Sequence, residues 1–471
     1  MALGNSLKFG TSGLRGLAVE LEGQAARQYT AAFLRHLAQI ANAPVRRVFL
    51  GRDFRPSSAA ILGDCAVAIA AAGLEPVDCG LIPTPALALH AQAQGGAAIM
   101  VTGSHIPADR NGLKFYLPTG EISKADEQGI VAALDGAHVE DHAVTLRDDS
   151  EAATARYLDR FASLLGKGAL AGMRVGVFEH STVARDLLAT ILEHCGAEVV
   201  RLGRIDGFVP VDTEAFSDPV FAPLSGWIGE HRLDAIVSAD GDGDRPLLMD
   251  NRGAFVRGDV LGLLAARYLG AQVVVTPVTS NSAIELTGYF ETVVRTRVGS
   301  PFVVAAMDTA DGAVVGFEAN GGTFVGKGVV VQDRPLPALA TRDAILPVLC
   351  LLGDAATQHK TVSQVCADIP LQHALADRLQ DVPGERSAAF LERLAADAEY
   401  AATVFEPHGI TRTAAIDGLQ FWTRSGDMVH FRASGNAPEL RCYVEAQTAE
   451  NAGALLIWGL ETAAREVGHK A

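Results

Sequence analysis

Short hydrophobic runs alternate along the chain with longer segments in which apolar residues recur at helical spacing. Three such cycles, each a strand, a helix and a second strand, are expected over residues 46–80, 173–200 and 233–276. The strand-like runs are rich in valine, leucine and isoleucine, which is typical of parallel strands buried on both faces. Strand, helix and strand at this spacing indicate βαβ units. The pattern therefore predicts three α/β domains of similar construction.

The C-terminal stretch has a different pattern. Helices are expected over 384–398 and 449–467. Four short strand-like runs lie between them, at residues 413–416, 419–422, 428–432 and 440–445. Asp-Gly and Ser-Gly-Asp turns separate several of these runs, which favours antiparallel pairing in an α+β unit. Polar or proline-containing stretches then divide the chain into four domains, over residues 1–145, 146–250, 251–370 and 371–471.

The composition narrows the class of protein. The chain has 471 residues, with 39 basic and 55 acidic side chains and a net charge of −16. Nucleic-acid binding relies on a basic surface, so this balance argues against a nucleic-acid partner. The longest apolar runs are about half as long as the roughly 20 residues that a membrane-spanning helix needs. The start of the chain lacks a signal-peptide pattern, and the six cysteines show no Cys-x-x-Cys spacing. We expect a cytoplasmic protein without a membrane partner.

A cluster of three aspartates follows the hydrophobic run 233–239. Asp240, Asp242 and Asp244 are separated only by glycines, and the run before them places the cluster at the carboxyl end of a strand. Three adjacent carboxylates are costly unless a cation neutralises them, and hard oxygen ligands suit Mg²⁺. The EF-hand pattern does not fit, because the glycine that it needs is replaced by Arg245. The alternative is a solvated acidic turn.

A serine lies at the exit of another strand-like run, 97–101. The segment Thr102-Gly-Ser104-His105-Ile-Pro107 offers a hydroxyl nucleophile in a good position for covalent catalysis. It lacks the Gly-x-Ser-x-Gly pattern of the α/β-hydrolases. The alternative is an ordinary turn before a proline.

Two further loops carry groups suited to a phosphorylated sugar. Between Arg432 and Arg441 the chain has two guanidinium groups, a hydroxyl, an amide and a glycine, which together can form a phosphate cradle. Glu318 and Asn320 lie on a glycine-rich loop and could bind sugar hydroxyls. Each loop could also be an ordinary turn. The run 321–327 fails as a nucleotide-binding P-loop, because glycine replaces the hydroxyl residue at position 328.

Taken together and in this order, these segments resemble the α-D-phosphohexomutase family, and within it the phosphomannomutase/phosphoglucomutase group. The resemblance runs from Phe9 to about Glu445. The segments that carry it are 9–16, 51–57, 102–114, 240–245, 318–321 and 432–441. It implies an α/β protein with three similar domains built on mainly parallel mixed sheets, and a C-terminal α+β domain, around a central cleft.

The resemblance also implies a role for particular residues. Ser104 would be the phosphoserine that donates and regains the phosphoryl group, and one Mg²⁺ per chain would be held by Asp240, Asp242, Asp244 and the phosphate on Ser104. Arg15, His105 and Lys114 would lie near the transferring phosphate, with Lys114 as a general acid/base. The substrate-binding residues implied are Arg245, Arg297, Glu318, Asn320, Arg432, Ser434, Gly435, Asn436 and Arg441.

The activity that the resemblance implies is the interconversion of mannose 6-phosphate and mannose 1-phosphate, and also of the glucose phosphates. A hexose 1,6-bisphosphate would be both intermediate and activator, and the protein would be a monomer or a homodimer. The chain departs from the family pattern at Gly103, Ile106, Asn436 and Ala437. It also departs from it at Gly322, the one of these positions at which many members have histidine. The alternatives are a phosphoglucosamine or acetylglucosamine-phosphate mutase and a non-catalytic sugar-phosphate sensor. An ATP-dependent sugar kinase and a phosphatase of the haloacid-dehalogenase type are disfavoured.

Overall fold

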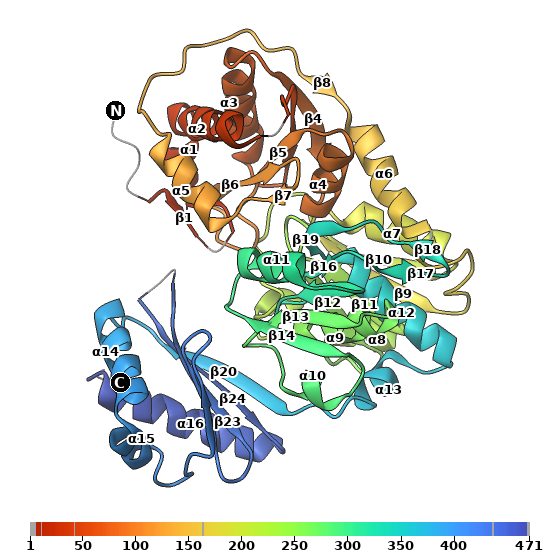
Figure 1. Ribbon diagram of the computed structural model, residues 1–471. Helices are drawn as coiled ribbons and strands as arrows, with labels where there is room; N and C mark the ends of the chain where they lie inside the picture. Colours follow the sequence, from red (N-terminus) through yellow and green to blue (C-terminus); the bar gives the residue numbers. More distant parts are fainter. Residues whose placement is uncertain (1–5, 11, 42, 163, 436–437, 469–471) are drawn as a thin grey trace. The chain divides into compact units, whose positions relative to one another are not determined.

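The computed structural model describes residues 6–10, 12–41, 43–162, 164–435 and 438–468. The chain divides into two units by its internal contacts (Figure 1). Unit 1 is Met1–Val275 with Gly299–Asp368, and unit 2 is Thr276–Val298 with Ile369–Ala471. Each unit therefore combines two separate stretches of sequence.

The first sheet of unit 1 has the strand order β1-β2-β6-β5-β3-β4-β8, with β7 beside β6. Its strands are β1 (Lys8–Phe9), β2 (Leu14–Leu17), β3 (Arg47–Arg52), β4 (Glu75–Leu81), β5 (Ala97–Val101), β6 (Arg110–Leu117), β7 (Gly120–Glu121) and β8 (Arg147–Asp148). Its helices are α1 (Ala18–Leu21), α2 (Gln24–Ile40), α3 (Ser58–Ala71), α4 (Thr84–Ala93) and α5 (Lys124–Ala132). Packing is led by rings such as Phe33 and Phe115, whose centroids are 4.8 Å apart. The strands β3, β4, β5 and β8 are parallel to one another, whereas β6 is antiparallel to its neighbours β5 and β2. The sheet is therefore mixed.

The second sheet of unit 1 has the order β10-β9-β11-β12. Its strands are β9 (Arg174–His180), β10 (Glu198–Arg204), β11 (Ala235–Ala239) and β12 (Pro246–Asp250). The helical elements of this stretch are α6 (Ser150–Ala162), α7 (Arg185–His194), η1 (Pro219–Phe221) and α8 (Leu224–His231). The strands β9, β10 and β11 are parallel, and β12 is antiparallel to β11.

The third sheet contributes β13, β15, β16 and β19, in that order, to the same unit. These strands are β13 (Val273–Pro277), β15 (Val314–Phe317), β16 (Thr323–Val325) and β19 (Leu339–Asp343), and a small hairpin is formed by β17 (Val330–Val331) and β18 (Arg334–Pro335). The helices are α9 (Gly258–Tyr268), α11 (Ser300–Thr309), α12 (Ile345–Gln358) and α13 (Val362–Ala367). Here β13 and β15 are parallel, while β16 is antiparallel to both β15 and β19.

The three sheets share one arrangement of a strand, a loop and a second strand. In each, a buried parallel strand leads through a short loop into an antiparallel neighbour: β5 into β6, β11 into β12 and β15 into β16. These loops carry Ser104, the three aspartates and Glu318, respectively. Polar groups collect there because the carboxyl end of a buried parallel strand is where its backbone leaves the sheet. The prediction of a multidomain α/β fold with mixed sheets is confirmed.

One sequence prediction about these strands is wrong. The third cycle, 233–276, was expected to be a single βαβ unit, but β11 pairs with β9 and β12, whereas β13 pairs with β15. The two strands belong to different sheets because the presumed loop contains β12, whose five residues are all buried. The hydrophobic run Pro246–Met249 was the signal for this strand.

Unit 2 has an entirely antiparallel sheet in the order β20-β24-β23-β22-β21. Its strands are β20 (His373–Leu379), β21 (Arg412–Ala414), β22 (Leu419–Trp422), β23 (Met428–Ala433) and β24 (Leu440–Ala446), and β14 (Thr292–Thr296) and α10 (Ala283–Leu286) also belong to this unit. The helices α14 (Gly384–Ala396), α15 (Ala398–Val404) and α16 (Ala449–Glu466) enclose a core with Phe390, Phe405 and Phe431. The helix expected over 384–398 ends at Ala396, because Asp397 caps α15 by accepting a hydrogen bond from the backbone N–H of Tyr400.

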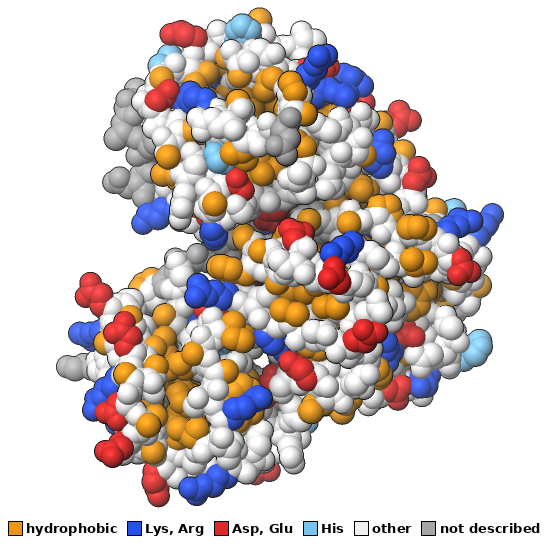
Figure 2. All heavy atoms as spheres, in the orientation of Figure 1, with side chains coloured by type: hydrophobic (Ala, Val, Ile, Leu, Met, Phe, Trp, Pro, Cys, Tyr) orange, Lys and Arg blue, Asp and Glu red, His pale blue; other side chains and the backbone are white. Residues whose placement is uncertain are grey.

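Charged side chains of both signs are interspersed over the face shown in Figure 2. Among the residues that the structure describes, no helix has the length and hydrophobicity needed to cross a bilayer.

Candidate active site

The three aspartates form one buried cluster at the end of β11. Asp240, Asp242 and Asp244 each offer a carboxylate oxygen, and these oxygens lie within 4.8 Å of one another. The loop folds back on itself, because Oδ1 of Asp240 accepts hydrogen bonds of 3.1 Å from the backbone N–H groups of Asp244 and Arg245. Gly243 makes the turn at a φ of +70°, a conformation that side chains disfavour. The cluster is therefore built into the fold rather than exposed as an acidic turn.

Ser104 lies against this cluster. Its Oγ donates a hydrogen bond of 2.6 Å to Oδ2 of Asp240, and it is 3.3 Å from Nδ1 of His105. The serine is fully buried and has a φ of +54°, which is uncommon for a residue other than glycine. Its backbone N–H donates to Oγ1 of Thr102 at 2.7 Å. Two loops of different sheets, predicted separately as nucleophile and metal ligands, thus meet in one place.

Arg55 holds the serine loop in this conformation, a role that the sequence interpretation did not assign. Its guanidinium donates to four backbone carbonyls at 2.6–2.8 Å, those of Ser104, Ile106, Pro107 and Arg110. Its Nε donates to Asp53 at 3.2 Å. A Cβ on Gly103 would lie 2.6 Å from Cζ of Arg55, so the glycine leaves room for the guanidinium. The segment 51–57 carried the signal, but only as a resemblance without a role.

Lys114 reaches the aspartates from β6. Its Nζ donates to Oδ2 of Asp242 at 2.5 Å and to Oδ2 of Asp244 at 2.6 Å. Burial favours the neutral amine, but the two carboxylates outweigh it and raise the pKa of Lys114. Thr84 also donates to Oδ2 of Asp242, at 2.6 Å. The lysine is therefore a buried, charged proton donor next to the metal candidates.

The aspartates differ in their proton affinity. Burial, together with repulsion from Asp242 and Asp244, raises the pKa of Asp240 well above its usual range. Burial acts in the same direction on Asp244, but the charges of Arg342 and Lys114 hold the pKa of Asp244 below its usual range. Repulsion within the cluster is thus only partly relieved by the protein's own cations.

The cluster fits a divalent cation. Oδ1 of Asp242 and Oδ1 of Asp244 are buried and accept no hydrogen bond from the residues that the structure describes. Buried oxygens without a donor are costly, and a cation can satisfy them. Carboxylate oxygens at a converging point are the ligands that Mg²⁺ uses. Asp240, Asp242 and Asp244 are therefore the residues that could hold the metal.

Three more predicted residues, His105, Arg15 and Arg245, interact electrostatically with one another near the aspartates. The positive charge of Arg245, followed by burial and the charge of Arg15, lowers the pKa of His105 well below its usual range, so this imidazole is neutral. Burial, with the charges of Arg245 and Arg342, lowers the pKa of Arg15 to about 10. The Nε of Arg245 is buried and donates no hydrogen bond within the described residues. These groups offer positive charge and donors for a phosphoryl group on Ser104.

The predicted sugar loop is reached through Arg342, which the sequence interpretation missed. Oε2 of Glu318 accepts a hydrogen bond of 2.6 Å from Nη1 of Arg342, and Nη2 of the same arginine donates to Oδ2 of Asp244 at 2.7 Å. Asn320 stabilises the loop, since its Oδ1 accepts from the backbone N–H of Gly322 at 3.0 Å. Arg342 lies on β19, far from every motif in the sequence, and no local pattern indicated it.

The remaining predicted residues belong to unit 2. Nε of Arg432 donates to Oδ2 of Asp417 at 2.7 Å, and Nε of Arg297 donates to the neighbouring carbonyl of Ile416 at 3.3 Å. Arg441 pairs with Glu439 at 3.1 Å. The backbone of Ser434 donates to the carbonyl of Glu439 at 2.9 Å, which closes the loop between β23 and β24. Gly435 lies on this loop, and Asn436 falls outside the described residues.

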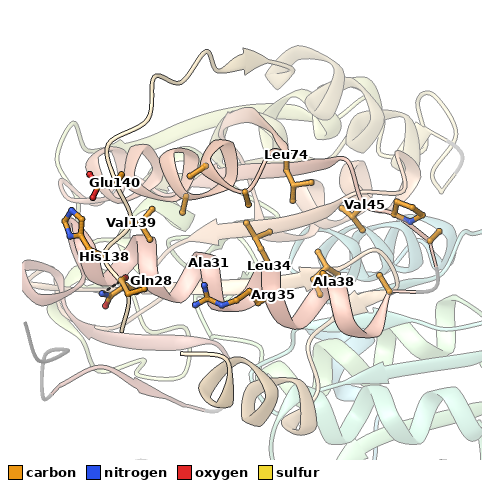
Figure 3. A pocket seen from close by; sticks show the side chains of 18 residues that line it. Gln28, Ala31, Leu34, Arg35, Ala38, Val45, Leu74, His138, Val139 and Glu140 are labelled. Atoms are coloured by element: carbon orange, nitrogen blue, oxygen red, sulfur yellow. Dashed lines mark hydrogen bonds between the residues drawn. The ribbon is translucent and has the colours of Figure 1, made fainter. Parts of the chain in front are cut away.

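A separate cavity of unit 1 lies away from these residues. It has a volume of about 780 Å³ and is lined by α2, α3 and the segment 137–140 (Figure 3). Its walls are mainly alanine, leucine and valine side chains. Arg35 at its edge is already bound to the carbonyl of Ala133 and to Asp135. Because none of the predicted site residues lines this cavity, the candidate chemistry belongs to the acidic loop.

Comparison with known proteins identifies relatives of this chain. The family description "Phosphoglucomutase/phosphomannomutase, alpha/beta/alpha domain I" matches residues 6–139, and that of domain III matches residues 257–372. A phosphomannomutase of Sinorhizobium fredii is 48% identical over 96% of this chain and 98% of its own. One of Salmonella muenchen is 41% identical over 95% of this chain and 94% of its own. A probable phosphoglucosamine mutase of Methanothermobacter thermautotrophicus is 26% identical, over 94% of this chain and 95% of its own.

The fold has matches among solved structures. A phosphoglucomutase/phosphomannomutase family protein from Burkholderia thailandensis has a TM-score of 0.79 at 21% identity and covers 98% of both chains. The similarity to the two phosphomannomutases spans nearly the whole chain and includes both units. The chain belongs to the α-D-phosphohexomutase family.

Proposed function

We propose that the protein is a Mg²⁺-dependent phosphomannomutase that interconverts mannose 6-phosphate and mannose 1-phosphate and also acts on the glucose phosphates. The observation that carries this proposal is the 2.6 Å hydrogen bond between Ser104 and Asp240. The Ser104 hydroxyl thus contacts one of three carboxylates that converge on one point, which supports a role for it as the nucleophile. Two relatives above 40% identity are phosphomannomutases, which favours mannose phosphates over glucosamine phosphates.

The charges around Ser104 suit a phosphoryl group. The carboxylates of Asp240, Asp242, Asp244, Glu318 and Glu121 lie close to several cationic side chains, those of Arg15, Lys114, Arg245 and Arg342. A divalent cation and a dianionic phosphate have opposite charges of equal size, so they could enter together without changing the net charge of the site. Phosphoryl transfer depends mainly on such neutralisation and on in-line positioning.

The residues around Ser104 would have separate roles in phosphoryl transfer. Mg²⁺ held by the three aspartates would neutralise charge on the transferring phosphoryl group. Arg15 and Arg245 would bind its oxygens, and neutral His105 would lie beside Ser104 without adding charge. As the phosphorus–oxygen bond to Ser104 breaks and the bond to the sugar hydroxyl forms, the proton of that hydroxyl leaves. Lys114, which is protonated, is the candidate carrier: it gives a proton to Oγ of Ser104 as that bond breaks, and it regains one from the sugar hydroxyl.

The rest of the predicted site would recognise the substrate. We assign the sugar hydroxyls to Glu318 and Asn320, whose loop is held by Arg342. We assign the phosphate that is not being transferred to the unit 2 residues Arg297, Arg432, Ser434, Gly435, Asn436 and Arg441. One cradle must serve both phosphates in turn, because the hexose 1,6-bisphosphate returns its other phosphate to Ser104. That bisphosphate would also act as an activator that phosphorylates Ser104.

We further propose the four-domain division at residues 145, 250 and 370, a cytoplasmic location, and a monomeric or homodimeric protein. The repeated strand–loop–strand construction of the three sheets supports the division, since each of the first three domains would then contribute one loop to the site.

A coupled mutase assay tests the function. Wild type and Ser104→Ala would be supplied with Mg²⁺, a trace of hexose 1,6-bisphosphate, and mannose, glucose or glucosamine 1-phosphate. We expect turnover to be highest with mannose 1-phosphate and to be abolished in Ser104→Ala. Preferred turnover of glucosamine 1-phosphate would replace the sugar assignment. No turnover of any sugar by protein carrying phosphate on Ser104 would overturn the mutase function.

A further inference from the structure

The glycine at position 322 leaves a space that Arg342 fills. A Cβ on Gly322 would lie 2.5 Å from Cδ, 2.7 Å from Cγ and 2.8 Å from Cβ of Arg342. The backbone of Gly322 has an ordinary conformation, since it is absent from the residues with positive φ. The requirement for glycine is therefore spatial: any side chain at this position would displace the arginine.

Arg342 uses this space to reach two loops at once. On one side, Nη1 donates to Oε2 of Glu318 and to Oγ of Ser300, both at 2.6 Å. On the other side, Nη2 and Nε donate to Oδ2 of Asp244 at 2.7 and 3.2 Å. The residue is only 3% exposed. A planar guanidinium can satisfy both carboxylates in fixed directions, whereas an ammonium group cannot.

The contacts leave the other oxygen of Asp244 free for a ligand. Arg342 and Lys114 both engage Oδ2, while Oδ1 is buried and accepts no hydrogen bond from the described residues. The arginine thus fixes the rotation of the carboxylate and determines which oxygen points to the candidate metal. In the same way it fixes Oε2 of Glu318 and leaves Oε1 for a sugar hydroxyl.

We propose that Arg342 is a positioning residue that joins the candidate metal loop, residues 240–245, to the candidate sugar loop, residues 318–322. We also propose that position 322 is a glycine because any side chain there would displace Arg342. This inference rests on the proposed function and extends it, because it makes Mg²⁺ affinity and sugar-phosphate affinity depend on one side chain. Arg342 acts through Asp244 and Glu318. A side chain at position 322 would exclude this arrangement, so the two residues act as a pair.

Two variants test the pair from opposite sides. Arg342→Lys keeps the charge but removes the fork that spans both carboxylates. Gly322→Ala leaves Arg342 intact and displaces it by a single methyl group. We expect each to raise the Mg²⁺ concentration at half-saturation and the KM for mannose 1-phosphate by about 10-fold or more, the range typical of outer-shell ligand partners. The double variant should be no worse than either single variant, because both remove the same interaction.

The controls separate positioning from stability. Arg201→Lys changes a partly exposed arginine that pairs with Glu179 and Asp186, and it should leave both constants unchanged. A purely structural role for Arg342 would reduce the amount of active enzyme, and so kcat, without changing either constant. That result would overturn the proposal. Multiplying effects in the double variant would also overturn it, since the residues would then act separately.

Direct Mg²⁺ binding distinguishes failure of this inference from failure of the proposed function. Calorimetric titration of Mg²⁺ into the full-length wild type and both variants needs no turnover. If wild type binds Mg²⁺ but converts no sugar phosphate, the mutase function fails, and a weaker Mg²⁺ affinity in both variants still supports the coupling. If Gly322→Ala binds Mg²⁺ as wild type does, the pairing of Gly322 with Arg342 is wrong whatever the activity.

Discussion

Ser104 donates a hydrogen bond of 2.6 Å to Asp240, although 136 residues separate them in the chain. The bond joins a loop of the first sheet to a loop of the second. Phosphorylation would remove the donor hydrogen and place a dianion beside a carboxylate. A cation is then needed between them, so the phosphorylated site should demand metal more strongly than the free serine does.

The first prediction follows from that pair. Protein phosphorylated on Ser104 should bind Mg²⁺ about tenfold or more tightly than the dephosphorylated protein, because the phosphate adds two negative charges to the site. Calorimetric titration of both forms measures this, with the phosphate content determined by intact mass. Ser104→Ala should match the dephosphorylated form. Equal affinities in the two forms would contradict a phosphate that completes the metal shell.

The second prediction concerns Asp242. Asp242→Asn keeps the shape of the side chain but removes one charge from the metal cluster, and it should lower kcat about 10²-fold or more. Saturating Mg²⁺ should restore part of the loss. Asp311→Asn is the matched control, since Asp311 is exposed and pairs with Lys327 at the surface. Comparable activities of the two asparagine variants would exclude Asp242 as a metal ligand.

The third prediction concerns Arg55, whose guanidinium holds the loop that carries Ser104. Arg55→Met leaves Asp53 as an uncompensated buried charge and removes the donors of four carbonyls, so it should lower the free energy of unfolding by about 3–5 kcal/mol. Gly103→Ala should cost about 1–3 kcal/mol, because its methyl group meets the guanidinium. Denaturant unfolding measures both changes.

Gly63→Ala serves as the control for Gly103→Ala. Gly63 lies in α3 with open space around its Cβ position, so alanine there should be neutral or stabilising. If Gly103→Ala is as stable as Gly63→Ala and fully active, the contacts of Arg55 with the serine loop do not require a glycine at position 103.

The fourth prediction concerns pH. Burial lowers the pKa of His430 to about 4, and its Nε2 donates to the carbonyl of Asp417. In the unfolded chain the histidine pKa is about 6.5. Between pH 6.5 and 4 the imidazole of residue 430 is therefore protonated in the unfolded chain but neutral in the folded protein. The stability contributed by neutral His430 is therefore present above pH 6.5 and is lost as the pH falls.

Between pH 7.5 and 5.0 this loss should be about 2 kcal/mol larger in wild type than in His430→Gln, which keeps an amide donor but does not titrate. Urea unfolding at the two pH values, followed by tryptophan fluorescence, measures the difference. An imidazole of His430 that titrates near pH 6.5 in an NMR experiment would contradict the prediction.

The elements that sequence alone could predict are those determined by local pattern. The strand β22 covers Leu419–Trp422 as expected, because alternating side chains and a following turn define it. The strand β20, His373–Leu379, was not predicted, because it lies at a sheet edge and most of its side chains are exposed. Without a buried face it has no hydrophobic signature.

The same distinction holds for the site. Asp240 and Ser104 could be proposed because each lies in a short motif directly after a hydrophobic run. Arg342 could not, because its importance comes from the pairing of β19 with β16 and from a missing side chain at Gly322. A residue whose role depends on a space left by another residue has no signature in its own neighbourhood.

The division of the chain into units has a consequence for synthesis. The segment Thr276–Val298 belongs to unit 2 but leaves the ribosome before Gly299–Asp368, which completes unit 1. Because chains fold as they emerge, unit 1 must close around an insertion some of whose partners do not yet exist. Ser282 is one such residue, since its backbone N–H awaits the carboxylate of Glu445. The nascent protein therefore passes through a stage in which the candidate-site loops are complete while the segment Thr276–Val298 still lacks part of its partners, and chaperones would be expected to bind at this stage.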